Sequence, residues 1–224
     1  MNCKHCNAPC IKKGYSKRTQ RYQCKACRRY QQQQYKYRLC QKEDEQTILK
    51  LNNIGVGISG IARFTGISKT HILNRIKQIA SKLTKPVIVE QEQEYEVDEL
   101  YTYIGRKDNP YYVVYAINKT TRQVIDMIVG KRTKETLRQV IESIKLLRPK
   151  KIYTDHLNIY AGLMDRSIHC QNAYQINHIE RFNLTLRTHL KRLSRRTICF
   201  SRSVVMLQNV LTLYCYTWKI KHQF

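Results

Sequence analysis

Acidic side chains are scarce in this 224-residue chain, which has 16 Asp and Glu residues against 41 Lys and Arg. Its formal net charge at pH 7 is therefore +25, and neither the first 42 residues nor the segment after Glu180 contains a carboxylate. Such a charge favours a polyanionic partner, because each cation that neutralises a phosphate releases condensed counterions. We expect nucleic acid to be this partner, and we expect the few carboxylates at the ends of structural elements to have specific roles.

Long hydrophobic runs are also missing. No apolar stretch approaches the roughly 18 residues of a membrane-spanning helix, and the N-terminus lacks a signal-peptide core. The sequence thus predicts no membrane partner and a cytoplasmic protein. Nine cysteines without an export signal are better explained as metal ligands and free thiols than as disulfides. The length allows one domain of ordinary size with small appendages.

Two Cys-x-x-Cys pairs characterise the N-terminal segment. The pairs are separated by 17 residues and consist of Cys3, Cys6, Cys24 and Cys27. Four thiolates at this spacing suit one tetrahedral structural Zn²⁺, whose binding would supply the folding free energy of a segment with little apolar content. We therefore predict a zinc ribbon over residues 1–42. Cys10 or Cys40 could replace one of the four, and a disordered basic arm with inactive cysteines is the alternative.

Residues 43–85 have the pattern of a helix-turn-helix domain. A helical period that starts at Glu43 ends at a glycine-containing break at 55–57. A short helix over 59–64, a turn at 65–67 and a longer helix that begins at Ser68 follow. The predicted DNA-contacting residues on the longer helix are Lys69, Thr70, His71, Asn74 and Arg75. The alternative is a packing module that contacts only phosphates. A linker is expected over 86–93.

Residues 94–224 are predicted to form an α/β domain with a mixed sheet. Segments 94–104, 111–118 and 122–130 are rich in Tyr, Val and Ile and are joined by short turns, which predicts three antiparallel strands. A helix over 133–147 then crosses over to a strand at 151–154 that runs parallel to the first strand. This is the layout of the ribonuclease H-like fold.

Three acidic residues of this domain form the candidate catalytic site. Asp98 lies within the first strand, Asp155 lies at the C-terminal end of the strand at 151–154, and Glu180 lies near the start of a basic helix over 178–195. Hard carboxylate oxygens suit two Mg²⁺ (or Mn²⁺) ions, which can stabilise the attacking and leaving oxygens of a phosphoryl transfer. Strand alternation places Glu99 on the opposite face from Asp98, so Glu99 is expected to be a poor ligand.

Further DNA contacts are expected on the same helix and just after it. Asn183, Arg187 and Lys191 share a stripe with Glu180 at helical spacing. Arg192, Arg195 and Arg196 belong to the basic segment that follows, which is typical of a phosphate-binding stretch. A purely solvated helix face is the alternative.

Several motifs together resemble the transposases of the insertion sequence 1 family. They are Val-Asp-Glu-Leu at 97–100, Thr-Asp-x-x-x-x-Tyr at 154–160, Ile-Glu-Arg-Phe-Asn-Leu-Thr-Leu-Arg-x-His-Leu-x-Arg-Leu at 179–193 and Arg-x-Thr-x-x-Phe-Ser-x-Ser at 195–203. The N-terminal modules fit the same family. The sequence departs from the family pattern at Tyr101, where a Trp is frequent nearby, and at His156 and Leu157, where Gly and Trp are usual.

The resemblance implies a metal-dependent Asp-Asp-Glu transposase, a polynucleotidyl transferase with catalytic Asp98, Asp155 and Glu180. Residues 1–85 would bind the terminal inverted repeats of the element. Strand cleavage at these ends would free a 3′-hydroxyl that attacks target DNA, so the partners would be double-stranded DNA and at least one further copy of the chain. A sequence-specific repressor and a structure-selective nuclease of the same fold are the alternative functions.

Overall fold

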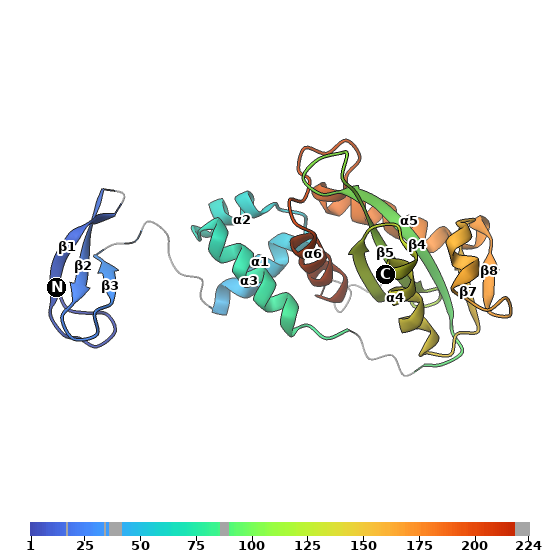
Figure 1. The fold of residues 1–224 in the computed structure, drawn as a ribbon, viewed down its shortest axis with the longest axis horizontal. Helices are drawn as coiled ribbons and strands as arrows, with labels where there is room; N and C mark the ends of the chain where they lie inside the picture. Colours follow the sequence, from blue (N-terminus) through green and yellow to red (C-terminus); the bar gives the residue numbers. More distant parts are fainter. Residues whose placement is uncertain (17, 34, 36–41, 86–89, 218–224) are drawn as a thin grey trace. The chain divides into compact units, whose positions relative to one another are not determined.

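The computed structural model describes residues 1–16, 18–33, 35, 42–85 and 90–217. The chain divides into two compact units, Met1–Leu39 and Cys40–Phe224 (Figure 1). Cys40, one of the alternative zinc ligands, lies outside the described residues. Within the described parts of the chain, no helix combines the length and the apolar character needed to cross a membrane.

The first unit is a small antiparallel sheet. Its strands are β1 (Cys10–Ser16), β2 (Thr19–Cys24) and β3 (Tyr30–Gln32), in the order β1-β2-β3. Most of its side chains are exposed or half-buried, and the buried ones include Cys3 and Cys24. Apolar burial is therefore small, and Cys3 and Cys24 are among its few buried side chains.

The second unit contains a five-stranded mixed sheet with the order β6-β5-β4-β7-β8. Strands β4 (Glu94–Tyr103), β5 (Pro110–Asn118) and β6 (Val124–Gly130) form the predicted antiparallel meander. After helix α4 (Lys134–Lys145), strand β7 (Lys151–Thr154) lies parallel to β4, as predicted. Strand β8 (His169–Gln171) extends the sheet beyond β7. The predicted mixed sheet is confirmed, whereas the three-residue β8 was too short to show a sequence pattern.

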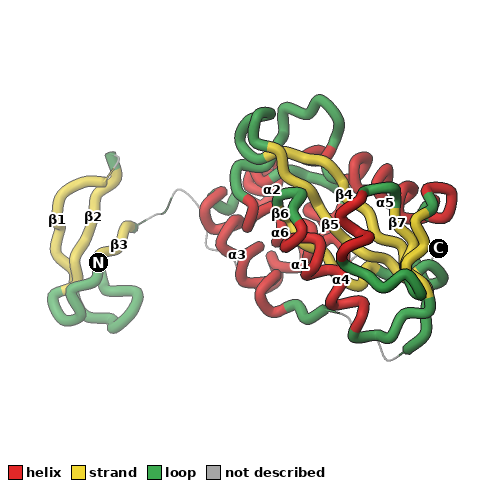
Figure 2. Tube along the Cα trace, turned by 45° about the vertical axis from the view of Figure 1, so that its right-hand side comes forward, coloured by secondary structure: helices red, strands yellow, loops and turns green. Residues whose placement is uncertain are grey.

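Helices pack against the strands of this sheet (Figure 2), and two hydrophobic cores cover its two faces. On one face, α4 packs against alternate strand residues such as Val97, Val114 and Ala116. On the other face, Leu100 and Tyr115 pack with helices α5 (Asn177–His189) and α6 (Val204–Thr217). The two-residue strand period thus sends neighbouring side chains to different cores.

Helices α1 (Lys42–Asn53), α2 (Ile58–Thr65) and α3 (Lys69–Lys82) occur where the sequence predicted three helices, and the Ser68 hydroxyl caps α3 by accepting from the His71 N–H. They do not form a domain separate from the sheet. Their buried isoleucines join the same core as α6, and α1 and α3 lie beside α6 (Figure 1). Helix α6 is apolar on more than one side, so it packs on the sheet and on these helices together.

Helix α5 is shorter than predicted, because it ends at His189 rather than near residue 195. Leu190 takes an extended conformation, and a 3₁₀ turn follows at Lys191–Leu193. The Arg187 guanidinium donates to the Leu193 carbonyl at 2.9 Å, and the Ser194 hydroxyl donates to the Arg187 carbonyl at 2.8 Å. These bonds fold the chain back over the last turn of α5. Two further 3₁₀ turns lie at Asn158–Gly162 and Ala173–Gln175.

Candidate active site and cysteine cluster

The acid cluster forms where β7 ends beside β4. The pairing of these strands covers Glu94 to Glu96, so β4 continues beyond the end of β7 at the level of Asp98. Asp155 follows β7 directly. Carboxylate oxygens of Asp98, Glu99 and Asp155 all lie within 4.8 Å of one another. Two of the three predicted catalytic residues therefore converge, together with Glu99.

Asp98 is held by two hydrogen bonds on the face of the sheet that α5 covers. Its Oδ1 accepts from the Glu99 N–H at 2.7 Å, and its Oδ2 accepts from the Asn183 side-chain amide at 2.6 Å. Burial raises the pKa of Asp98; these bonds oppose the rise, and the negative charges of Asp155 and Glu180 add to it. A cation at this place would relieve the repulsion among the acids.

Glu99 points to the other face, as strand alternation predicted, but its carboxylate still reaches the cluster. One oxygen accepts from the Tyr160 hydroxyl and the other pairs with Arg132 at 2.9 Å. The side chain is 1% exposed, and burial raises its pKa against the effect of these partners. Because its charge is paired with the Arg132 guanidinium, Glu99 acts as the counter-ion of Arg132.

Asp155 is more accessible than Glu99. Its side chain is 35% exposed, and its Oδ1 accepts from the Leu157 N–H at 2.9 Å. Arg132 lies 4.0 Å from Asp155, farther than from Glu99. The position of Asp155 at the C-terminal end of β7 leaves an oxygen open to solvent.

Glu180 lies in the first turn of α5 and is exposed. It is not part of the tight oxygen cluster, although its charge contributes to the raised pKa of Asp98. Glu96, buried on β4, fixes this end of α5: it accepts from the Ile179 N–H at 2.8 Å and lies 2.5 Å from His178 Nδ1. Sequence reasoning missed Glu96. Its position two residues before Asp98, on the same strand face, was the available signal.

The predicted DNA-contacting residues of α5 and its extension divide into two groups. Asn183, Arg187 and Arg192 are half-buried and make internal bonds; Arg192 lies 3.2 Å from the Ser201 hydroxyl. Lys191, Arg195 and Arg196 are exposed. The second group retains cationic ends that DNA can reach.

On α3, four of the five predicted contacts are exposed, namely Lys69, Thr70, His71 and Asn74. Arg75 is half-buried, and its guanidinium lies 3.3 Å from Glu45 on α1 and donates to Gln78 at 3.1 Å. The exposed set is polar and continuous with the N-terminal end of α3, where a free helix surface suits groove contacts.

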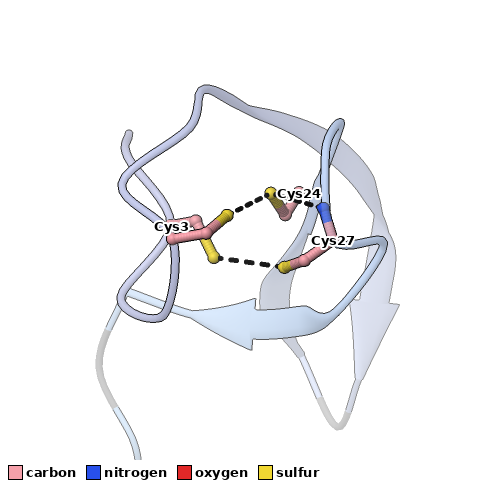
Figure 3. A group of neighbouring side chains, drawn as sticks. Cys3, Cys24 and Cys27 are labelled. Atoms are coloured by element: carbon pink, nitrogen blue, oxygen red, sulfur yellow. Dashed lines mark hydrogen bonds between the residues drawn. The ribbon is translucent and has the colours of Figure 1, made fainter.

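The predicted cysteines converge at one end of the N-terminal sheet. Their four sulfur atoms lie within 4.8 Å of one another; Cys3 and Cys27 are 3.7 Å apart, and Cys6 and Cys24 are 3.4 Å apart. Cys3, Cys24 and Cys27 point toward a common centre (Figure 3). A hydrogen bond from the Cys27 N–H is the main cause that lowers the pKa of Cys24 to about 6.

Cys10 is not in this group. Its thiol donates to the Ala8 carbonyl at 3.8 Å and accepts from the Gln31 side-chain amide at 3.4 Å. The described geometry favours Cys3, Cys6, Cys24 and Cys27 as a closed tetrahedral donor set, since four thiolates are the donors of structural zinc sites.

Known proteins match the second unit. A family model for the IS1 transposase matches residues 93–222. The insertion element iso-IS1n protein InsB of Shigella dysenteriae is 35% identical over 129 residues, which cover 58% of this chain and 95% of that protein. The insertion element IS1 protein InsB of Shigella flexneri is 32% identical over 127 residues, which cover 57% and 95% of the two chains.

Two solved structures show a weaker likeness. One is a chain of the simian T-cell lymphotropic virus intasome in complex with PP2A regulatory subunit B56 gamma, with a TM-score of 0.40, 16% identity, and coverage of 75% of this chain and 67% of that one. The other is the HTLV-2 integrase catalytic core domain in complex with magnesium, with a TM-score of 0.35, 15% identity, and coverage of 60% and 99%. Neither likeness is close enough to transfer a site.

The family match covers more than half of the chain, including the sheet and its acid cluster. It defines a DNA transposase, and transposases are polynucleotidyl transferases. The chain belongs to the IS1 transposase family.

Proposed function

We propose that this transposase binds the terminal inverted repeats of its element and catalyses metal-dependent strand cleavage and strand transfer. The observation that carries the proposal is the convergence of Asp98 and Asp155 at the end of β7, within the matched domain. Glu180 would complete the ligand set from the first turn of α5, since its charge already affects Asp98. Hard carboxylate oxygens in this arrangement fit two Mg²⁺ or Mn²⁺ ions.

The side chains of the candidate site would have different roles in phosphoryl transfer. Bound Mg²⁺ would supply the Lewis-acid chemistry that stabilises the attacking and leaving oxygens. Asp98 and Asp155 would hold the metal ions, and Glu180 would join them from the first turn of α5. Lys191, Arg195 and Arg196 would contact DNA phosphates next to this site, because they are exposed on the segment that follows α5.

The N-terminal modules would recognise the ends of the element. Cys3, Cys6, Cys24 and Cys27 would hold one structural Zn²⁺, and their clustered sulfur atoms support this assignment. Lys69, Thr70, His71 and Asn74 on α3 would contact the major groove as a helix-turn-helix recognition surface. Because two element ends must be joined, the active assembly would contain at least two copies of the chain on DNA.

Substitution of Asp155 by Asn tests this function. The purified full-length protein is incubated with an end-bearing duplex, a target plasmid and Mg²⁺, and nicked and joined products are separated on a gel. Asp155→Asn is expected to lower cleavage about a thousandfold, because several kcal/mol of transition-state stabilisation are lost. Binding to the ends, measured by gel shift, should remain.

Asp165→Asn is the matched control, since Asp165 is exposed and outside the acid cluster. It should cleave like the wild type. Wild-type protein that binds ends without cleaving them in Mg²⁺ would favour a repressor. Cleavage of branched DNA irrespective of sequence, without joined products, would favour a structure-selective nuclease.

A further inference from the structure

Three polar side chains connect the sheet to α5 at the candidate metal site. Tyr115 on β5 lies directly opposite Asp98 on β4 in the antiparallel register, so both side chains project from the same face. Asn183 on α5 bridges them. Tyr115 is fully buried, and Asn183 and Asp98 are half-buried.

The hydrogen bonds of this bridge have a defined direction. The Tyr115 hydroxyl donates to Asn183 Oδ1 at 2.7 Å, and Asn183 Nδ2 donates to Asp98 Oδ2 at 2.6 Å. A side-chain amide has one acceptor end and one donor end. Because the tyrosine occupies the acceptor end, the donor end must face the carboxylate. A flipped amide would place two acceptor oxygens together at Asp98.

The surroundings keep Tyr115 in the donor role. Burial raises the pKa of Tyr115 well above 10, so its hydroxyl keeps its proton. The same hydroxyl lies 3.2 Å from the Ile179 carbonyl, one turn before Asn183 on α5, and the ring packs edge-on against Phe182. The tyrosine is therefore fixed against α5 by three neighbouring residues of that helix.

We infer that Tyr115 and Asn183 are positioning residues that hold the Asp98 carboxylate in one orientation for a divalent cation. We call this pair the Tyr115–Asn183 relay. It explains why Asn183, which shares a stripe with Glu180, is directed inward and not toward DNA. The inference rests on the proposed metal-dependent function. Partners of metal-binding carboxylates restrict their rotation, and removal of such partners typically weakens metal affinity.

Tyr115→Phe removes the single oxygen atom that begins the relay. Zinc-loaded full-length protein is titrated with Mn²⁺, and free Mn²⁺ is followed by electron paramagnetic resonance. The dissociation constant for Mn²⁺ is expected to rise about tenfold in Tyr115→Phe and by at least as much in Asn183→Ala, because the carboxylate loses its fixed orientation.

Tyr95→Phe is a closely matched control. Tyr95 is also fully buried in the same sheet, on β4, but it faces the α4 core, and its hydroxyl has no hydrogen-bond partner among the described residues. Removal of its hydroxyl should keep the Mn²⁺ dissociation constant within about twofold of the wild type, since no hydrogen bond is lost.

A double-mutant cycle separates the relay from a general loss of packing. If Tyr115 acts through Asn183, Tyr115→Phe should cause no further change in Mn²⁺ affinity in the Asn183→Ala background. A structural role alone would lower the thermal midpoint and leave Mn²⁺ affinity unchanged. Should Tyr115→Phe fail to fold, Asn183→Ala at its half-buried helix position carries the test.

Two outcomes would overturn the inference, and they differ. Wild-type affinity for Mn²⁺ in Asn183→Ala, with Asp98→Asn impaired, would exclude the relay and leave the metal site intact. Equal absence of Mn²⁺ binding in the wild type and in Asp98→Asn would exclude the metal site itself, and the relay with it.

Discussion

Glu99 and Asp155 occupy one acid cluster but have different environments. The Glu99 side chain is 1% exposed and the Asp155 side chain is 35% exposed, while Arg132 lies 2.9 Å from the first and 4.0 Å from the second. Arg132 thus lies within reach of two carboxylates, and it forms the shorter ion pair with the buried one, Glu99. The Arg132 guanidinium therefore lies nearer to Glu99 than to Asp155, the residue that the proposed function needs as a ligand.

Glu99→Gln should remove the ion pair between Glu99 and Arg132. The amide retains the size of the side chain and a partner for Tyr160, but it removes the charge that holds Arg132. We expect Arg132 to move toward Asp155, so that cleavage requires a higher Mg²⁺ concentration. We also expect a loss of about 1–2 kcal/mol in unfolding free energy, because the pair is partly screened by solvent at Arg132.

Urea denaturation and a Mg²⁺ titration of cleavage measure the two effects of Glu99→Gln. Glu142→Gln serves as the control, because Glu142 is 56% exposed and pairs with Lys145 one turn later on α4. An unchanged Mg²⁺ requirement in Glu99→Gln would show that Arg132 does not compete for Asp155.

At the residue scale, local patterns predicted side-chain direction better than side-chain partners. The strand period placed Asp98 and Glu99 on opposite faces, and the structure agrees. It did not indicate that Glu99 still reaches the cluster, because that depends on where β7 ends. Helical spacing also did not reveal that Asn183 and Arg187 form hydrogen bonds inside the protein. The partners of Asn183 are on β4 and β5, far away in the sequence. Arg187 bonds to β4 and to the segment after α5, and the sequence did not show where that helix ends.

At the element scale, the turn between α1 and α2 lies against the end of α5. An ideal Cβ on Gly55 would be 1.7 Å from the His189 carbonyl oxygen, and Gly55 has a φ of +81°. Both the conformation and the close approach require glycine. The last turn of α5 is thereby in contact with the turn between α1 and α2, while Glu180 lies in the first turn, at the opposite end of α5.

Gly55→Ala should weaken this contact strongly. The methyl group meets backbone that cannot move aside easily, and the positive φ is strained for alanine, so we expect a loss of about 3 kcal/mol or more in unfolding free energy. Gly57→Ala changes the same turn where a Cβ meets nothing within 4 Å, and it should stay within about 1 kcal/mol of the wild type. Equal denaturation midpoints for the two variants would contradict the close approach.

The elements themselves were largely predictable. Periodicity and turn residues indicated α1 to α4 and strands β4 to β7 within a few residues. The end of α5 was not predictable, because the apolar spacing continues through Leu190 and Leu193 although the helix stops at His189. Hydrogen bonds from Arg187 and Ser194 stabilise the chain where the helix ends, and these bonds form only in the folded chain.

At the scale of the whole molecule, the chain is two units that differ in how much apolar surface they bury. Residues 43–85 were expected to fold apart from residues 94–224, but α6 contributes to the core of both, and the second unit is continuous from Cys40. The isoleucine pattern of α1 to α3 indicated a buried face without indicating what covers it. Composition was more informative for the first unit, where few apolar side chains and four clustered thiols indicate a metal-dependent fold.

Chelation of zinc should therefore unfold the first unit and leave the second folded. We expect amide NMR signals from residues 1–33 to collapse after chelator is added, while the thermal transition of the second unit is unchanged, because its two cores contain no cysteine of the cluster.

Cys24→Ser should have the same effect, and Cys199→Ser, at an exposed thiol of the second unit, should have none. Acid should also release zinc, since protons compete with the metal for the four thiolates. Retention of the first unit's dispersed signals in metal-free protein would show that its hydrogen-bonded sheet is sufficient, and the proposed zinc site would lose its structural role.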